Sequence, residues 1–416
     1  VDVSNFQMDL ASLIPKRSAQ EESPSERLAK VPAASVPVFV NVAGDVGIDH
    51  RYINADPPKE RYFLMHEAVG AGVACLDFDL DGEVDLYIGQ GACNAPDGVG
   101  TAPNLMTRNL GDRFATVTES TGTDDRGYSL GVTAGDWNQD GFADLIVANM
   151  TTNTMFLNQG DGTFRRWEGD DLWRDGKYTA SIAIADVTGD HLPDVVEVTY
   201  LDDEAIYKPL VFGDDGIPVR FPGPLHFRAC LDRVYVGQAD GSMKGQTLNT
   251  DSPSPGLGLL ITDIDGRGGN EIFVANDMKA NHLWLRTSSE TDEEPAFVDA
   301  AVARGIAYGP SGMPLACMGI AAADFDENGL IDFHITNFTD QWTNQYMQTP
   351  QNLFDDLTLP FGLDQTSLKM LGFGTQPIDY DNNSTIDLIT GNGHIDDMSH
   401  EGTPFEMPTQ LFTGDR

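Results

Sequence analysis

Hydrophobic and polar positions follow one pattern that occurs six times along the chain. Each copy has a strand-like run rich in glycine and alanine, then an acidic loop, then a run rich in β-branched residues. The first two copies read GVACLDFDLDGEVDLYIGQ from Gly72 and GVTAGDWNQDGFADLIVAN from Gly131. The other four begin at Ser181, Gly256, Met318 and Gly372. This order of residue types predicts two antiparallel strands joined by a tight loop.

The stretches between the copies predict further strands. Turn sequences built on Gly-Asp or Asp-Gly start at Asn109, Asn158 and Gln238, each between two short strand-like runs. Each repeat is therefore expected to hold about four antiparallel strands, and the first loop acids lie 50 to 77 residues apart. We predict an all-β fold, a β-propeller of six or seven four-stranded blades. The small residues suit innermost strands around a central channel, and a stacked solenoid is the less favoured alternative.

The acidic loops follow the pattern Asp-x-(Asp/Asn/Thr)-x-(Asp/Asn)-Gly-x-x-(Asp/Glu). Ca²⁺ takes about six to eight hard oxygen ligands, and acids at alternate loop positions converge on one point where a glycine permits a sharp bend. Without a cation these carboxylates would repel one another. We therefore predict about four to six Ca²⁺ ions. The expected ligands, loop by loop, are Asp77, Asp79, Asp81 and Asp85; Asp136, Asn138, Asp140 and Asp144; Asp186, Thr188, Asp190 and Asp194; Asp263, Asp265 and Glu271; Asp324, Asp326, Asn328 and Asp332; and Asp379, Asp381, Asn383 and Asp387.

These loops differ from EF-hands, which need a glutamate at the twelfth position and flanking helices. Only the third loop has an acid there, Glu197, and the runs that flank all six loops are strand-like. The sequence therefore predicts calcium loops within β-hairpins. Acidic turns that bind no metal are the alternative interpretation.

Two loops depart from the pattern. The third has Thr188 at the second ligand position and His191 in place of the glycine, and we expect the threonine to bind through its hydroxyl or to leave room for water. The fourth has Arg267 at the third ligand position. Its guanidinium repels a cation, so pairing with Asp263 or Asp265 in place of an ion is an open alternative for this loop.

Charge narrows the range of partners. The 416 residues include 65 acidic and 25 basic side chains, a formal charge of −40, and 48 of the acids are aspartate. Aspartate suits turns and oxygen-ligand loops better than helices. This charge disfavours nucleic acid and anionic membranes as partners, and no run of 18 apolar residues predicts a membrane span.

Catalytic motifs of the GxSxG, HExxH, P-loop and GxGxxG types are absent from the sequence. We expect His66 and His394 to make structural hydrogen bonds, and the five tryptophans to pack in the core rather than to form a sugar platform. The cysteines, Cys75, Cys93, Cys230 and Cys317, show no CxxC spacing. Buried thiols are expected, with a Cys75–Cys93 disulfide as the first alternative.

The repeats resemble the FG-GAP/VCBS repeat, and several segments are similar to the family of cartilage acidic protein 1 and its bacterial ASPIC/UnbV-type relatives. Those segments are the stretch from VFVNV at residue 38 through the first loop, FPGPLHF from Phe221, VANDMKANHLWL from Val274 and GNGHIDD from Gly391. The resemblance covers about residues 36–416. It implies a secreted or surface-exposed calcium-binding propeller, typically seven-bladed, that acts as a binding or adhesive module. Family members commonly continue into a further repeat and an ASPIC/UnbV domain, whereas this sequence stops at Arg416; VFVNV is then a candidate strand for closing a ring of six.

Residues 1–35 are polar and rich in Ser, Glu and Pro, and we interpret them as an N-terminal tail or linker before a propeller at 36–416. We expect the tail to make an assembly contact. The predicted function is non-catalytic recognition of a protein or glycan at the cell surface or matrix. The alternatives are a structural subunit of an extracellular filament or complex, and a polysaccharide-acting hydrolase or lyase with its site at the propeller mouth. We expect an extracellular or periplasmic location with the signal peptide removed.

Overall fold

The computed structural model describes residues 39–54, 64–91, 99–169, 177–208, 211–212, 218–220, 223–287, 295–395, 397, 399 and 402–414. Contacts divide the chain into two units, residues 1–41 with residue 416, and residues 42–415. All of the described strands lie in the second unit.

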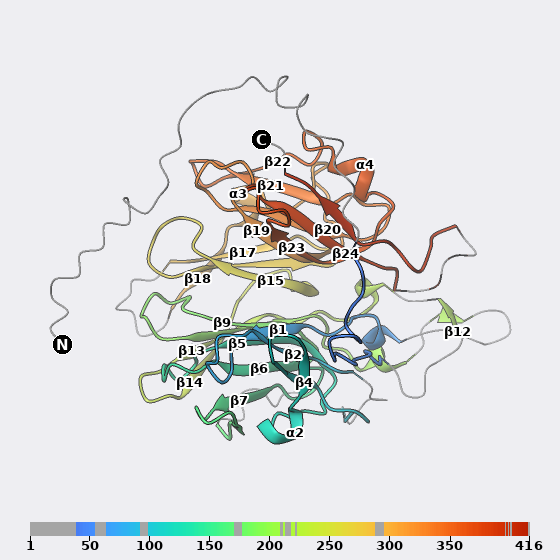
Figure 1. The fold of residues 1–416 in the computed structure, drawn as a ribbon. Coiled ribbons are helices and arrows are strands. Elements are labelled where there is room, and N and C mark those ends of the chain that lie inside the picture. Colours follow the sequence, from blue (N-terminus) through green and yellow to red (C-terminus); the bar gives the residue numbers. More distant parts are fainter. Residues whose placement is uncertain are drawn as a thin grey trace. The chain divides into compact units, whose positions relative to one another are not determined.

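Six antiparallel sheets follow one another along the chain (Figure 1). Blade 1 contains β1 (Val73–Leu76), β2 (Asp85–Ile88), β3 (Leu105–Asn109) and β4 (Phe114–Thr116). Blade 2 contains β5 (Ser129–Gly135), β6 (Asp144–Asn149), β7 (Thr154–Asn158) and β8 (Phe164–Arg166). Blade 3 contains β9 (Thr179–Ala185), β10 (Asp194–Thr199), β13 (Arg233–Gly237) and β14 (Met243–Thr247), with the hairpin of β11 (Val211–Phe212) and β12 (Pro218–Arg220) inserted.

The second half of the chain repeats this arrangement. Blade 4 contains β15 (Gly256–Thr262), β16 (Glu271–Asn276), β17 (His282–Arg286) and β18 (Phe297–Asp299). Blade 5 contains β19 (Cys317–Ala323), β20 (Asp332–Asn337), β21 (Asn344–Gln348) and β22 (Phe354–Asp356). Blade 6 has three strands among the described residues, β23 (Gly372–Ile378), β24 (Asp387–Asn392) and β25 (Gln410–Phe412).

Helices are short and lie in the connections. They are η2 (Met65–Glu67), α2 (Thr118–Thr121), η4 (Glu204–Tyr207), η5 (Pro224–His226), α3 (Ala301–Arg304) and α4 (Leu363–Ser367). No described helix is long and apolar enough to cross a membrane.

The six innermost strands surround one channel. Residues of β5, β9, β15, β19 and β23 line it, together with Gly70, Ala71 and Gly72 just before β1. Each innermost strand ends at its acidic loop, and neighbouring loops touch: the backbone N–H of Asn270 donates to the carbonyl oxygen of Asp186 at 3.1 Å. The predicted β-propeller is therefore confirmed, with six blades and with the acidic loops gathered at one end of the channel.

Glycine near the start of an innermost strand allows close contact with the next blade. A Cβ atom at Gly258 would lie 2.3 Å from the carbonyl oxygen of Met318, and one at Gly319 would lie 1.9 Å from that of Phe373. Neither distance leaves room for a side chain, which explains the small residues at these positions.

Blades 3 and 6 differ from the others at the position of Gly258 and Gly319. In blade 3 it holds Ser181, whose hydroxyl donates a 2.6 Å hydrogen bond to the carbonyl oxygen of Leu257 in blade 4. In blade 6 it holds Gly374, and a Cβ atom there would meet no atom within 4 Å. The close approach seen at the other junctions is therefore missing where blade 6 faces blade 1.

Hydrophobic side chains fill the spaces between successive blades from blade 1 to blade 5. Between blades 1 and 2, Tyr87 packs with Phe156, and between blades 4 and 5 the rings of Phe273 and Phe333 lie 5.2 Å apart. Trp137 and Trp284 are buried in two of these clusters, as expected for core tryptophans, whereas Trp167 and Trp342 are only half-buried and Trp173 lies outside the described residues.

The leading segment of the propeller lies against blade 1. Residues 39–42 form no strand, so the closing strand considered for VFVNV is not seen in the described part of the chain. Further on, the carbonyl oxygen of Val46 accepts a hydrogen bond from the backbone N–H of Phe114 in β4 at 2.7 Å. This contact directs residues 42–48 along the outer edge of blade 1.

Candidate functional site

The first acid of each loop organises the backbone of that loop. In the second loop, Asp136 accepts hydrogen bonds from the N–H groups of Asp140 at 3.0 Å and Gly141 at 2.9 Å, one on each carboxylate oxygen. The same pair of bonds occurs at Asp77, Asp324 and Asp379. The repeated sequence pattern therefore produces a repeated local structure.

Left-handed backbone supports these turns at two positions. Gly141 has φ 92°, as predicted for the glycine of the pattern, while His191 and Ser384 adopt φ 69° and 67° at the same position without glycine's freedom. The fourth loop position is also left-handed, at Gln139 and Glu327 for example. No residue type marks that position in the sequence, so the pattern did not reveal it.

The last acid of each loop is buried and joins the loop to the sheet. Asp144 accepts from the N–H of Trp137 at 3.0 Å in its own loop and from that of Asn158 at 2.8 Å at the end of β7. Asp332 makes the matching bonds with Phe325 and Gln348. Burial is the main cause that raises the pKa of Asp144 and of Asp332 to about 6, partly offset by these hydrogen bonds.

Three carboxylates converge in four of the six loops. One oxygen from each of the first, third and ninth loop residues lies within 4.8 Å of the others in the sets Asp77, Asp79 and Asp85; Asp263, Asp265 and Glu271; Asp324, Asp326 and Asp332; and Asp379, Asp381 and Asp387. Hard oxygen atoms at this spacing fit a divalent ion such as Ca²⁺. In the other two loops the third position is Asn138 or Thr188, which brings an amide or hydroxyl oxygen instead of a third carboxylate.

The fifth loop residue lies outside these carboxylate sets. Its side chain caps the turn, as where Asp140 accepts from the N–H of Phe142 at 3.0 Å and Asn328 accepts from that of Leu330 at 2.7 Å. Ligation by this position, predicted for Asp81, Asp140, Asp190, Asn328 and Asn383, stays a prediction.

The third loop compensates for its unusual residues. Thr188 donates its hydroxyl to Asp186 at 3.4 Å, and its backbone N–H donates to Asp194 at 3.0 Å. His191 is almost fully exposed, and its Nδ1 lies 4.0 Å from Asp186. Burial raises the pKa of Asp194 to about 6. Asp186 still accepts two backbone hydrogen bonds, but one of them comes from Gly189, at the fourth position, in place of the fifth.

A cation of the protein itself reaches into the first loop. The Nη2 atom of Arg108, on β3, lies 2.7 Å from an oxygen of Asp79 and 2.9 Å from one of Asp81. The hydrogen bond to Asp81 is the main cause that raises the pKa of Arg108. Sequence analysis missed this residue because it lies on a strand well after the loop.

In the fourth loop, Arg267 makes a weaker contact with the loop acids than Arg108 makes in the first loop. Its Nε lies 3.7 Å from an oxygen of Asp265, so the expected pairing is present, but 83% of its side chain is exposed. The carboxylates of Asp263, Asp265 and Glu271 remain together beside it. Both the predicted ion and its replacement by this arginine therefore stay open for the fourth loop.

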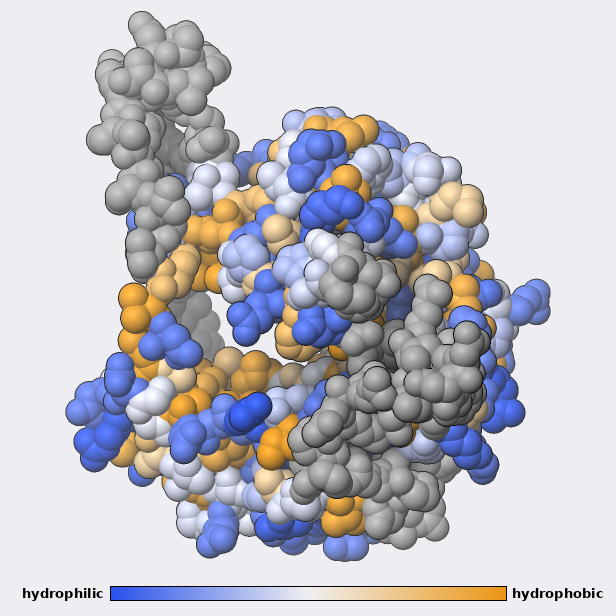
Figure 2. Space-filling view, turned by 90° about the vertical axis from the view of Figure 1, so that its right-hand side faces the viewer, coloured by the Kyte–Doolittle hydropathy of each residue, from blue (hydrophilic) through white to orange (hydrophobic). Residues whose placement is uncertain are grey.

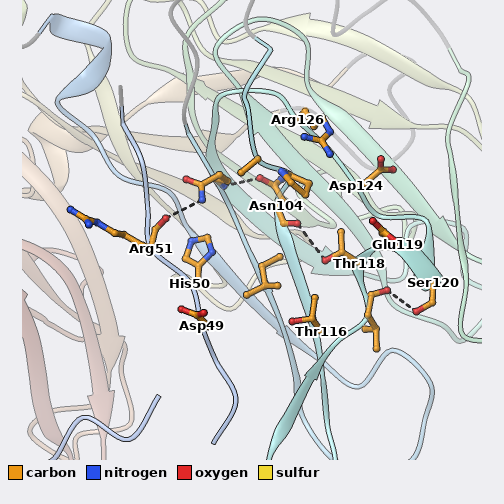
Figure 3. Close-up of a pocket in the computed structure, with 15 residues that line it drawn as sticks. Asp49, His50, Arg51, Asn104, Thr116, Thr118, Glu119, Ser120, Asp124 and Arg126 are labelled. Carbon is orange, nitrogen blue, oxygen red and sulfur yellow. Dashed lines mark hydrogen bonds between the residues drawn. The ribbon is translucent and has the colours of Figure 1, made fainter. Parts of the chain in front are cut away.

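An open polar cleft of about 560 Å³ lies beside blade 1 (Figure 3). Asp49, His50 and Arg51 form one side, and residues from α2 and the strands β3 and β4 form the other. Arg126 lies at the far end, where it donates to the carbonyl oxygen of Thr101 at 3.0 Å. Burial lowers the pKa of His50, which favours its neutral ring. The cleft offers both charges and several hydroxyl groups to a polar ligand.

The remaining sequence-based expectations concern histidines and cysteines. The Nδ1 atom of buried His66 lies 3.2 Å from the carbonyl oxygen of Ile206, a structural contact of the kind expected. Cys317 is buried as a free thiol, Cys75 is exposed and Cys230 is half-buried, so burial holds for only some of the cysteines. Cys75 is a free thiol, which contradicts the alternative of a Cys75–Cys93 disulfide, and Cys93 itself lies outside the described residues.

Comparison with curated proteins finds no match. Among solved structures, an Agrocybe aegerita lectin that recognises non-reducing terminal N-acetylglucosamine is 15% identical, with 83% of this chain and 80% of that chain covered and a TM-score of 0.44. An auxiliary nutrient binding protein from Bacteroides thetaiotaomicron is 10% identical, with 78% and 67% covered and a TM-score of 0.42. These scores are too low to indicate what this chain binds.

A family description does match one part of the chain. The FG-GAP-like repeat matches residues 136–197, which run from the second acidic loop to the end of the third. This stretch includes the strands from β6 to β9 and both loop backbones described above. Residues 136–197 are therefore identified as an FG-GAP-like repeat within a six-bladed propeller.

Proposed function

We propose that this protein is a calcium-binding β-propeller that acts as a non-catalytic recognition module outside the cell. The observation that supports it best is the recurrence of one carboxylate geometry in four loops, with oxygens of three acids within 4.8 Å. Without a cation such groups repel one another, and a divalent ion removes that repulsion.

Ca²⁺ would act here as a structural ion. Asp136 and its counterparts already accept two amide hydrogen bonds, and a carboxylate has further lone pairs available for a metal. In the first, second, third and fifth loops the last acid also accepts a hydrogen bond from the end of the third strand, so an ion there would connect the loop with two strands. Binding to the folded state alone would stabilise it by mass action.

The cleft of Figure 3 is the surface that we propose for recognition of a polar partner such as a glycan. Asp49, Arg51 and Asp124 provide charged acceptors and donors, and Thr116 and Ser120 add hydroxyl groups. A ligand rich in hydroxyl groups can exchange its bonds to water for bonds to this set.

The distribution of raised pKa values favours binding over hydrolysis. A polysaccharide hydrolase needs two carboxyl groups that face an open cleft, one of them with a raised pKa. Here Asp144, Asp194 and Asp332 have raised pKa values, but both oxygens of each are held by backbone N–H groups of the loop and of the third strand. Burial raises the pKa of Asp232 to about 7, but this side chain is buried and accepts from the backbone N–H of Thr199. The pKa of Asp277 is also raised, yet Asp277 is the single acid among the described residues that line its cavity.

The tail at residues 1–35 lies outside the described residues, so its assembly contact stays a proposal. A role as a subunit of an extracellular filament or complex rests on that contact. Secretion is likewise proposed, because calcium loops of this kind suit the calcium-rich medium outside cells.

Native mass spectrometry and calorimetric unfolding, each with Ca²⁺ and with EDTA, test the proposal. We expect several bound Ca²⁺ ions, each stabilising the fold by about 2.7 kcal/mol when free Ca²⁺ is 100 times its Kd. Mg²⁺ at the same concentration serves as the control, since it prefers a smaller octahedral site. The same mass and melting temperature with Ca²⁺ and EDTA would contradict the proposal.

A further inference from the structure

A second cavity, of about 400 Å³, lies at the end of the channel opposite the acidic loops. Apolar side chains dominate its lining, among them Leu257, Met318 and Phe373 from three innermost strands. Figure 2 views this side of the molecule and shows hydrophobic residues beside an opening near its centre. An apolar, half-enclosed cavity of this size is typical of small-ligand sites.

Segments that the sequence analysis singled out meet at this cavity. Gly223 to His226 come from FPGPLHF, Asp277 and Met278 come from VANDMKANHLWL, and Ile395 comes from GNGHIDD. The proposed calcium binding does not explain why these segments are present. Asp277 follows β16, whose first residue Glu271 belongs to the fourth loop, so about 20 Å of strand separates the cavity from the ion sites.

Asp277 is the one carboxylate among the described residues that line the cavity, and its position is fixed. Its backbone N–H donates to the carbonyl oxygen of Pro255 at 2.8 Å. The hydroxyl of Tyr200 donates to its Oδ2 at 2.6 Å, and Tyr200 itself is buried. The pKa of Tyr200 is well above its usual range, chiefly through burial, so this hydroxyl stays protonated and remains a donor.

The charge of Asp277 is not balanced by a protein cation. No lysine or arginine forms an ion pair with it in the described part of the chain, and Oδ1 has no hydrogen bond there. Burial raises its pKa to about 6, so above that pH a carboxylate stands in an apolar cavity with one oxygen free. An unpaired charge in such surroundings favours a ligand of opposite charge.

We propose that this cavity binds an organic ammonium ion, with the ammonium group at Asp277 and the carbon chain against the apolar wall. Met278 and Phe338 lie on that wall and offer sulfur and aromatic contacts to the chain or to the cation. A free alkylamine and a lysine side chain share this chemistry. The site does not depend on the proposed calcium binding.

Titration calorimetry in Ca²⁺-containing buffer at pH 7.5 tests the proposal with n-hexylammonium as the probe. We expect saturable one-to-one binding that is at least about tenfold tighter than for 1-hexanol, which has the same chain without the charge. N-acetyl-lysine methylamide in a second titration distinguishes a lysine side chain from a free amine. Binding of either ammonium supports the proposal, and equal binding of the neutral alcohol overturns it.

Asp277→Asn is the decisive variant, because the amide keeps the size of the side chain and can still accept from Tyr200. We expect it to weaken hexylammonium binding at least about tenfold and to leave bound Ca²⁺ unchanged. Asp112→Asn is the matched control, because it removes the same charge from a side chain that is 79% exposed in blade 1. An equal loss of hexylammonium affinity in both variants would mean that binding depends only on the net charge of the protein, which overturns the proposed site.

Binding is also expected to weaken as the pH falls through about 6, where Asp277 takes up a proton. The other titratable groups facing it are Tyr200, Cys317 and His226. The first two stay neutral, since the pKa of Cys317 is raised to about 12 by burial and that of Tyr200 lies well above its usual range. A His226→Gln variant that keeps the same pH profile assigns the change to Asp277, whereas a flat wild-type profile contradicts the proposal.

Discussion

The Asp77 loop of blade 1 and the Asp324 loop of blade 5 share one backbone and differ in how their charge is balanced. In both, the first acid accepts two backbone hydrogen bonds and the last acid is buried. In blade 1, Arg108 contacts Asp79 and Asp81. In blade 5 no described lysine or arginine forms an ion pair with Asp324, Asp326 or Asp332.

The difference arises outside the loops. Arg108 pairs with Ala115 on the neighbouring strand, and the residue at the same place in blade 2 is Leu157. In blade 1 a single position on the third strand therefore brings a protein cation to the loop acids. We infer that loops with the same acidic pattern need not depend equally on Ca²⁺.

The largest effect is expected from removing one carboxylate from the blade 5 loop, with the matching change in the blade 1 loop for comparison. Asp326→Asn should lose about 1–3 kcal/mol of Ca²⁺-dependent stabilisation, because one ion site loses a charged ligand. In EDTA the same change should be neutral or slightly stabilising, since it relieves repulsion with Asp324 and Asp332. Calorimetric unfolding of the variant in both buffers measures this reversal.

Asp79→Asn makes the matching change in blade 1, and its effect on stability in EDTA should be opposite to that of Asp326→Asn. In EDTA it should lower the melting temperature, because Arg108 loses one of its two carboxylates. In Ca²⁺ its effect should be smaller than that of Asp326→Asn. If the two variants respond alike in both buffers, Arg108 does not distinguish the loops.

A smaller effect is expected from removing the arginine. Arg108→Leu, which copies Leu157 of blade 2, should raise the Ca²⁺ affinity of the first loop about two- to five-fold, the range that an exposed ion pair supplies. In EDTA it should lower stability, because the carboxylates of Asp79 and Asp81 then face each other unpaired. Calcium titrations followed by native mass spectrometry measure the change, and an unaltered titration would contradict it.

The smallest effect is expected in the fourth loop. Arg267 is 83% exposed and lies 3.7 Å from Asp265, so Arg267→Ala should change Ca²⁺ affinity by less than about two-fold. The same titration measures it. A change as large as that of Arg108→Leu would show that an exposed arginine lowers the Ca²⁺ affinity of a loop as much as a half-buried arginine does.

The sequence predicted what depends on local pattern. Turn residues, alternate acids and β-branched runs act within a few residues of one another, so the six hairpins and the convergence of Asp324, Asp326 and Asp332 were predictable. Their repetition predicted a ring of six or seven blades, and the structure has six. The role of Glu271 as the last acid of an irregular loop was predicted on the same grounds.

Features that depend on contacts between distant segments were not predictable. Arg108 meets the Asp77 loop only because β2 and β3 are paired, and no spacing rule relates the two. The cavity at Asp277 needs residues from several blades at one end of the channel. The left-handed fourth loop position has no residue signature, because leucine, glutamine, glutamate and asparagine all adopt it.

Gly374 gives the propeller an uneven distribution of local stability. At Gly258 and Gly319 a neighbouring backbone presses against the strand, whereas Gly374 has free space. A ring closed by equal junctions opens only by breaking two of them at once, but a ring with one loose junction can fray from that point blade by blade. Amide protons of β23 and β24 should therefore exchange with solvent through smaller openings than those of β6, so that blade 6 behaves as the least cooperative part of the molecule.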